Sequence, residues 1–468
     1  MNLSFANNPS PGSSVFDFPA HRQAVHTSQV PQDRTRTLPS LASHLADSGS
    51  FIVVSGGTGC NPICSAFGPD ACYVLPISDD GGSSSEIIRV LGGPSIGDIR
   101  SRLIRLIPTV EKGSPLDAIR TLLSHRLTSD AFEKDAREEW RDIVEGHSRL
   151  WTGIPNDRKE MIRGFLVYFE SELLKRAHKN FSFVNGSIGN YFLAAAQGFF
   201  RSLPSAIFLF SSITHSQANI LPVIVTNHTV TIAAELADRR KIIGQCEISH
   251  PVHATPVMNV VDGGSNQEDQ DSMGELLVQK KNVLFDADGK ETAIGLPSPI
   301  SSKSFGIYYI NAYGNEILPS PNPDFLTNIP MRQALVYSCG SLWTSIIPCL
   351  ALRGVAKGIA KSHSLKAKVL MLNSKNDRET EGYAAVDFIN AIVRTLNSAY
   401  GTDAASISYP TSAFITHIVY LHDTEVVVDV QKITNMGVKC VGVNGAQEKR
   451  FDSECVQDAL RDILAEVV

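Results

Sequence analysis

The segment from residue 51 to residue 85 constrains the fold more than any other part of the chain. It holds two short apolar runs, FIVV at 51–54 and CYVLPI at 72–77, and each ends in small polar residues. The first is followed by SGGTG (55–59) and the second by SDDGGSSS (78–85). A buried run closed by a glycine turn, with apolar spacing resuming near Pro62, is typical of a strand, a tight turn and a helix N-terminus. We therefore expect two strands of an α/β sheet here.

Both turns carry residues suited to a phosphorylated ligand. Glycines let the backbone approach an anion closely, and the N-terminus of a following helix favours negative charge. Asp79 lies about 20 positions after the first turn, the spacing at which an acidic residue commonly binds a ribose. With Asp80 it also offers the oxygen ligands that Mg²⁺ shares with substrate phosphates. The alternative is an Asx-type turn with two solvated carboxylates.

Length and composition exclude several classes of protein. The chain has 468 residues, a net charge of −6 and no clustered basic patch, so we expect no nucleic-acid partner. Its 8 cysteines are scattered and lack zinc-finger spacing, which favours reduced, buried thiols. No apolar run approaches the roughly 20 residues that span a bilayer. Residues 1–48 lack apolar periodicity and a signal-peptide pattern, and we expect them to be disordered. These features predict a cytoplasmic protein without a membrane partner.

The middle of the chain predicts an insertion and a β-hairpin. Residues 112–180 are charged and helical in pattern, so we expect a helical insertion there. Residues 229–248 alternate on both sides of ADRR (237–240), which predicts a hairpin, and the acidic stretch 262–275 is expected to be a mobile loop.

Two polar side chains in this half have alternative interpretations. Arg100, near the start of a helix that Asp98 is expected to N-cap, could grip a diphosphate or pair with a carboxylate. Asn190 could bind a ligand or cap a turn, and the cap is favoured on the residues alone.

The last third returns to alternating strands and helices. A strand at 334–339 is followed by Gly340, Ser341 and Thr344 ahead of a helix expected near Ile346, which makes a second plausible anion site. Strands are also expected at 367–372, 417–421 and 438–443, with a helix from Tyr383 onward. This alternation predicts a doubly wound, mostly parallel α/β sheet.

The ordered motifs GGTG, SDDGGSS, GDIR, NGSIGN, LPVI, GSLWTSIIPCL and NSKNDRETEGY resemble the 2-phospho-L-lactate transferase (CofD-like) family and its relatives of the YvcK gluconeogenesis-factor type. The resemblance covers residues 50 to 400 and looks most like the plant and fungal branch. It implies a Rossmann-like core, often dimeric, that binds a nucleotide-linked substrate. Transferase members move a phospholactyl-type group from a guanosine diphosphate-linked donor to a deazaflavin alcohol, with Mg²⁺ and release of GMP.

The resemblance also implies roles for individual residues. Asp79 and Asp80 would ligate Mg²⁺ or orient the acceptor hydroxyl, with Asp80 as the candidate general base. The donor and its phosphates would be contacted by Gly56, Gly57, Thr58, Gly59, Arg100, Asn190, Gly340, Ser341 and Thr344. One segment departs from the pattern: where many prokaryotic relatives read TQPGET, residues 375–380 read KNDRET. Acceptor recognition is therefore expected to differ.

Two hypotheses follow. The first is a Mg²⁺-dependent transferase acting on a nucleotide-diphosphate-linked donor, and the paired aspartates favour it. The second is a non-catalytic regulator of carbon metabolism that binds a nucleotide-sugar. A nicotinamide-dependent oxidoreductase is disfavoured because GGTG lacks the third glycine of G-x-G-x-x-G.

Overall fold

The computed structural model describes residues 50–57, 59–129, 132–216, 219–235, 241–249, 306–398, 408–445 and 449–467. The chain divides into two units, Met1–Asp47 and Ser48–Val468, and every element below belongs to the second. The N-terminal segment expected to be disordered and the acidic loop expected at 262–275 lie outside the described residues.

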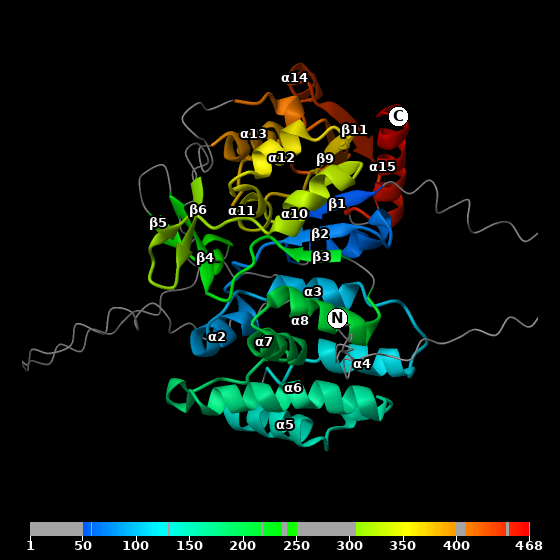
Figure 1. The fold of residues 1–468 in the computed structure, drawn as a ribbon. Coiled ribbons are helices and arrows are strands. Elements are labelled where there is room, and N and C mark those ends of the chain that lie inside the picture. Colours follow the sequence, from blue (N-terminus) through cyan, green and yellow to red (C-terminus); the bar gives the residue numbers. More distant parts are fainter. Residues whose placement is uncertain are drawn as a thin grey trace, which may run out of the picture. The chain divides into compact units, whose positions relative to one another are not determined.

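A seven-stranded parallel sheet forms the core, in the order β11-β10-β9-β8-β1-β2-β3. Its strands are β1 (Phe51–Val54), β2 (Cys72–Leu75), β3 (Asn219–Pro222), β8 (Ala334–Tyr337), β9 (Ala367–Met371), β10 (His417–Leu421) and β11 (Lys439–Val443). This confirms the predicted α/β class. From β1 the chain proceeds to β2 and β3 on one side, and from β8 it proceeds to β9, β10 and β11 on the other (Figure 1). The order therefore reverses between β1 and β8, where open α/β sheets bind ligands.

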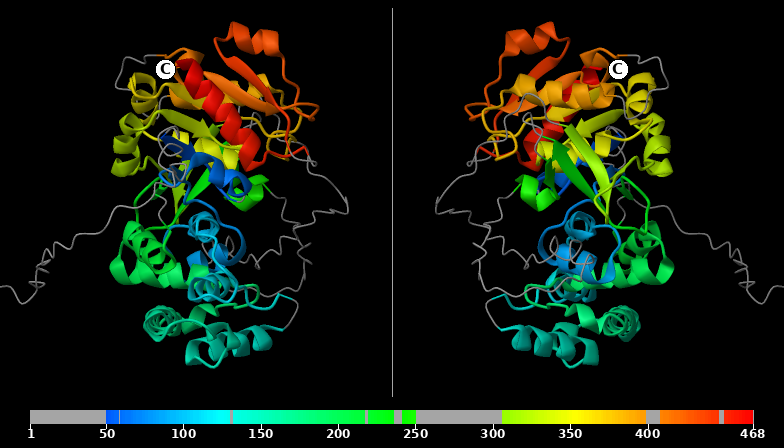
Figure 2. Two further views of the ribbon diagram at one scale, coloured as in Figure 1. Left: turned by 90° about the vertical axis from the view of Figure 1, so that its right-hand side faces the viewer. Right: turned by 90° about the vertical axis from the view of Figure 1, so that its left-hand side faces the viewer.

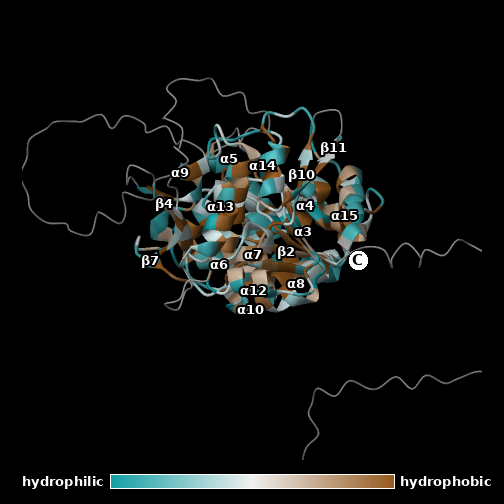
Figure 3. Ribbon diagram, turned by 90° about the horizontal axis from the view of Figure 1, so that it is seen from above, coloured by the Kyte–Doolittle hydropathy of each residue, from teal (hydrophilic) through white to brown (hydrophobic). Residues whose placement is uncertain are grey.

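The central strands are continuous apolar runs because both faces of the sheet are covered. Every residue of β1, β2, β8 and β9 is buried. The strands in the middle of the view from above are correspondingly hydrophobic (Figure 3). Full burial of each large apolar side chain contributes about 1.5–3 kcal/mol.

Helices supply the covering layers, together with an outer layer that packs on these helices and not on the sheet (Figure 1). They are α2 (Gly82–Leu91), α3 (Gly97–Arg105), α4 (Pro115–Ser124), α5 (Glu133–Glu145), α6 (Asn156–Leu174), α7 (Ile188–Phe200), α8 (Leu203–Thr214), α10 (Pro323–Asn328), α11 (Ile347–Leu350), α12 (Val355–Lys361), α13 (Ala385–Asn397), α14 (Val430–Asn435) and α15 (Ser453–Val467). Helices α4, α5 and α6 fall in the stretch expected to form the insertion, and α6 packs on α7 (Figures 1 and 2). Trp140 of α5 packs against Phe169, Phe183 and Tyr191, which joins these helices into one aromatic core.

A smaller antiparallel sheet, in the order β5-β4-β6-β7, lies beside the main sheet (Figure 1). Its strands are β4 (Val230–Glu235), β5 (Lys241–Ile243), β6 (Gly306–Asn311) and β7 (Glu316–Ile317). Strands β4 and β5 pair as predicted, but the second strand does not continue to Ile248. Gly244, at φ +94°, ends it, and residues Gln245–Ser249 form the short helix α9. The Cys246 N–H bonds the Asp80 side chain rather than a neighbouring strand, which explains the early end.

Three expected helix starts also shift. The helix expected near Pro62 is a 3₁₀ helix, Asn61–Phe67. The turn expected to lead into a helix near Ile346 is already helical from Leu342, as a π-type segment (Leu342–Ile346) that continues into α11. The helix expected from Tyr383 begins at Ala385.

Within the described residues no single helix is long and apolar enough to cross a membrane. One pair bent by 78°, Leu342–Leu350 with Val355–Lys361, passes the same test of length and composition. Its members include some of the most deeply buried residues of the core, among them Cys349 and Val355.

Candidate functional site

The turns that follow β1 and β8 pack directly on each other at the switch point. A β-carbon added at Gly59 would lie 2.9 Å from the Gly340 Cα and 3.0 Å from the Cys339 carbonyl oxygen. One added at Gly56 would lie 2.6 Å from the Ser345 Oγ. Close packing therefore requires Gly59 against the turn after β8 and Gly56 against Ser345 of the π-type segment, whatever ligand binds there. Thr58 lies outside the described residues.

Gly57 and Gly340 are the more open glycines of these turns. Both have positive φ, +42° and +140°, in the range that favours glycine. A β-carbon at Gly340 would meet nothing within 4 Å, and one at Gly57 would be in ordinary contact with Asp98, at 3.5 Å. Gly340 is held by Asn373, whose amide oxygen accepts from the Gly340 N–H at 3.0 Å and whose amide nitrogen donates to the Gly340 carbonyl at 2.8 Å.

Asp98 is not the helix N-cap that the sequence suggested. It lies in the first turn of α3 and accepts a hydrogen bond from the Gly57 N–H, so it joins α3 to the glycine turn. Burial raises its pKa, while the Gly57 hydrogen bond and the charge of Arg102 work in the opposite direction. Its Oδ2 is buried and has no hydrogen-bond partner among the described residues. Sequence reasoning missed this residue because an aspartate at a helix start usually serves as a cap.

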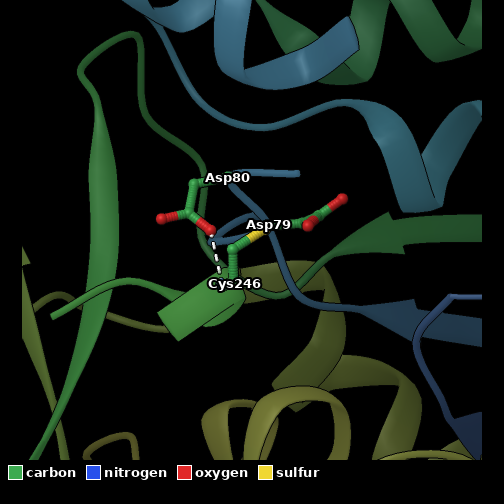
Figure 4. A group of neighbouring side chains, drawn as sticks. All are labelled: Asp79, Asp80 and Cys246. Carbon is green, nitrogen blue, oxygen red and sulfur yellow. Dashed lines mark hydrogen bonds between the residues drawn. The ribbon is translucent and has the colours of Figure 1, made fainter. Parts of the chain in front are cut away.

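Asp79 and Asp80 follow β2 and point to different sides of the chain (Figure 4). Asp79 Oδ1 accepts from the Gly81 N–H at 3.0 Å, and burial, together with the charge of Asp98, raises the pKa of Asp79 well above its usual range. Asp80 Oδ1 accepts from the Cys246 N–H at 2.8 Å, which ties α9 to this turn.

The N-termini of α2, α3 and α7 converge beside these aspartates. The Asn190 amide of α7 donates to Ser83 Oγ of α2 at 2.7 Å, and its oxygen accepts from Arg100 Nε of α3 at 3.1 Å. The α7 N-cap is Ser187, so Asn190 is not the cap that the sequence favoured. Arg100 bonds Asn190 and forms no ion pair with a carboxylate among the described residues, while its contact with a diphosphate stays a prediction. Burial and the nearby charge of Arg126 lower its pKa to about 10, so Arg100 remains cationic at neutral pH.

A second polar cluster centres on the buried carboxyl of Glu379. It accepts from the Thr344 hydroxyl at 2.7 Å, the Trp343 N–H at 3.1 Å and the Ser249 hydroxyl of α9. Burial and the charge of Asp377 raise the pKa of Glu379 to about 7, against the lowering effect of these hydrogen bonds. Helix α9 therefore contacts Asp80 through Cys246 and Glu379 through Ser249.

The structure thus brings most predicted site residues to one edge of the sheet, in two groups. Asp79, Asp80, Arg100 and Asn190 surround the starts of α2, α3 and α7. Thr344 belongs to the Glu379 cluster, and Ser341 lies beside it, with its Oγ 3.5 Å from an Asp377 oxygen. Cys246 and Ser249 were not predicted, and no sequence signal could have placed a hairpin end against residues more than 100 positions away.

The residues around Asp79 fit a divalent cation. Asp79, Asp80 and Cys246 each offer a ligand atom, and these three atoms lie within 4.8 Å of one another. Carboxylate oxygens are the ligands that hard cations prefer, and the unpartnered Asp98 oxygen adds negative charge nearby. A cation here would neutralise charge between the aspartates and a bound phosphate.

A parallel sheet whose strand order reverses beside glycine turns, acidic residues and helix N-termini defines a doubly wound α/β protein. Residues 51–446 match the family model of 2-phospho-L-lactate transferase CofD, and the chain belongs to this family.

Two relatives and one solved structure extend this finding. The yeast (Saccharomyces cerevisiae) protein "Uncharacterized protein YNL011C" is 34% identical over 88% of this chain and 99% of its own length. A "Putative gluconeogenesis factor" from Thermotoga maritima is 20% identical over 74% of this chain and 76% of its own. BH3568 is a UPF0052-family protein from Bacillus halodurans with a crystal structure. Its superposition covers 88% of this chain and 99% of BH3568, with a TM-score of 0.55 and 18% sequence identity. The two proteins therefore share the fold.

Proposed function

We propose that this protein is a transferase that moves a phospho-linked group from a nucleotide-diphosphate-linked donor to an alcohol, with a divalent cation such as Mg²⁺. The observation that carries the proposal is the convergence of three helix N-termini and the Arg100 cation on the turn that bears Asp79 and Asp80. Helix N-termini and a buried guanidinium attract a diphosphate, and the aspartates supply ligands for its cation. The family match supports this choice of chemistry.

The transfer asks mainly for positioning and charge neutralisation. The acceptor oxygen forms a bond to the distal phosphorus, and the phosphorus–oxygen bond to the nucleoside monophosphate breaks with its electron pair. Arg100 offsets charge on the departing phosphate, while Asn190 fixes the direction of the Arg100 guanidinium. Asp80, whose Oδ1 accepts from the Cys246 N–H, is the base for the acceptor proton. A bound cation supplies Lewis-acid stabilisation of the phosphate oxygens.

The decisive assay is release of nucleoside monophosphate by the full-length protein, given a guanosine diphosphate-linked lactyl donor, an alcohol acceptor and Mg²⁺. We expect metal-dependent release, and a loss of about 100-fold or more in Asp79→Asn. Asp70→Asn is the matched control, because Asp70 is exposed and precedes β2 at the opposite end of the strand. The proposal fails if the wild type binds the donor in calorimetry but releases no monophosphate, or if Asp79→Asn keeps its rate.

A second function is a regulator of carbon metabolism that binds a nucleotide-sugar without turnover. The similarity to the Thermotoga maritima protein named as a gluconeogenesis factor favours it. Binding of uridine diphosphate sugars without metal and without product release would distinguish this function from the first.

A further inference from the structure

Cys246 brings a thiol to a site whose other ligands are carboxylates. Its side chain lies between Asp79 and Asp80 (Figure 4), and one ligand atom from each residue lies within 4.8 Å of the others. Donors bound at about 2.0–2.3 Å to one tetrahedral cation lie about 3.3–3.8 Å apart, about 1 Å less than the 4.8 Å limit found here. Small rotations of these side chains therefore suffice to place all three on one ion.

The backbone fixes this arrangement. The Cys246 N–H donates to Asp80 Oδ1 at 2.8 Å, and the Cys246 residue is only 7% exposed. Just before α9, a β-carbon at Gly244 would clash with the Asp80 carboxylate. Glycine, here at φ +94°, therefore permits the close approach of this turn to Asp80. The thiol is thus held at the aspartates by the turn that ends β5.

The described residues form no ion pair with the acidic side chains of this site, and the charge of Arg102 acts on Asp98 without an ion pair. Asp98 is 7% exposed, its Oδ2 has no hydrogen-bond partner among the described residues, and its charge acts on Asp79. In the described part of the chain, no Lys or Arg nitrogen lies within 4.0 Å of the Asp79, Asp80 or Asp98 carboxylates. Carboxylates withdrawn from water without a counter-charge cost several kcal/mol, which a bound cation offsets.

We propose that Cys246 is the third protein ligand of this cation site, and that the site binds zinc-class divalent cations more tightly than Mg²⁺. Thiolate ligands select zinc and similar metals, whereas Mg²⁺ requires near-octahedral oxygen ligands. Three protein ligands leave a tetrahedral position open, as in catalytic zinc sites, and a substrate phosphate oxygen can occupy it. A role for this cation in group transfer rests on the proposed function, but the binding of the cation to the protein does not.

Cobalt is the direct probe, because Co²⁺ bound to a thiolate gives a charge-transfer absorption that an all-oxygen site lacks. The metal-free, full-length protein is titrated with Co²⁺, and then with Zn²⁺ and Mg²⁺ in competition. We expect the thiolate band in the wild type, its loss in Cys246→Ser, and a 10- to 100-fold fall in the Zn²⁺ affinity of that variant with little change for Mg²⁺. Cys440→Ser is the control, since Cys440 lies on β11 at the far edge of the sheet and should leave the band intact.

Absence of the band in the wild type overturns the inference even if Cys246→Ser does not fold. So does a band that persists in Cys246→Ser. Turnover with Mg²⁺ but no cobalt–thiolate band would leave the transferase proposal standing and remove this one. A cobalt–thiolate band without any release of nucleoside monophosphate would support the cation site and contradict the transferase proposal.

Discussion

Arg102 is a buried cation whose counter-charge comes from a cysteine. The residue has 0% exposure, and its guanidinium donates to Cys64 Sγ at 2.7 Å, Cys60 Sγ at 3.1 Å and Ser55 Oγ at 3.1 Å. Among the described residues no carboxylate pairs with it. Burial works to raise the pKa of Cys60, but the Cys64 hydrogen bond and the Arg102 charge lower it from 9.0 to about 5. With a pKa of about 5, the Cys60–Cys64 pair carries one negative charge at neutral pH, held by Cys60, and Cys60→Ser removes the thiol that holds it.

The size and sign of the effect follow from the pKa shift. Because the folded-state pKa of Cys60 is below its unfolded value, its contribution is complete above about pH 9 and is lost as the pH falls towards about 5. The upper bound is about 5 kcal/mol, and the slope is about 1.4 kcal/mol per pH unit. The hydrogen bond to Cys60 and burial raise the pKa of Cys64. This shift affects the free energy of unfolding only above about pH 9, where the Cys64 thiol ionises in the unfolded chain but not in the folded one. Removing the anion should cost about 3–5 kcal/mol near pH 8.

The measurement is the free energy of unfolding in urea, with a thiol reductant, at about pH 6 and about pH 8. The difference between the wild type and Cys60→Ser should grow by about 3 kcal/mol between these two values. Cys64→Ser is the control, because a hydroxyl can still donate to the Cys60 thiolate and the wild-type slope should remain. Parallel pH profiles for the wild type and Cys60→Ser would refute a thiolate–guanidinium pair.

Two further predictions follow from the site. Gly59→Ala should destabilise the protein by about 1–3 kcal/mol, because the new methyl group would lie 2.9 Å from the Gly340 Cα. An unchanged midpoint of thermal unfolding would contradict this prediction. Glu379→Gln should flatten the pH dependence of stability between about pH 4.5 and about pH 7. Because the folded-state pKa of Glu379 is raised, its contribution to stability is complete below about pH 4.5 and is lost as the pH rises through about 7. If the free energy of unfolding of Glu379→Gln in urea changes with pH as steeply as that of the wild type, this prediction is wrong.

The strands and their turns could be predicted because their signals are local. FIVV and CYVL are each buried along their whole length, and glycine turns follow them. The order of strands and helices then implied a parallel sheet, and the alternating residues of 229–248 implied the hairpin, whose strands β4 and β5 pair. The stop at Gly244 was missed because a period-two pattern continues past it, and only the contact with Asp80 turns the chain into α9.

Roles of individual site residues were harder to predict. Asp98 looked like a helix cap and Asn190 like a turn cap, yet Asp98 bonds the Gly57 N–H and Asn190 joins Ser83 to Arg100. All three partners lie far away in the sequence. Hydrogen-bonding side chains have several possible partners of similar energy, so the sequence leaves the choice open.

The sequence by itself determined the α/β class, the family and the edge of the sheet at which the polar residues gather, because apolar periodicity and glycine turns act over a few residues. The tertiary structure alone decided that Gly56 and Gly59 serve close packing against the segment after β8, that α9 joins Asp80 to Glu379, and that a thiol stands beside the paired aspartates. Each of these depends on segments far apart in the chain, which the pairing of β1 with β8 and the contacts of α9 bring together and which no local pattern encodes.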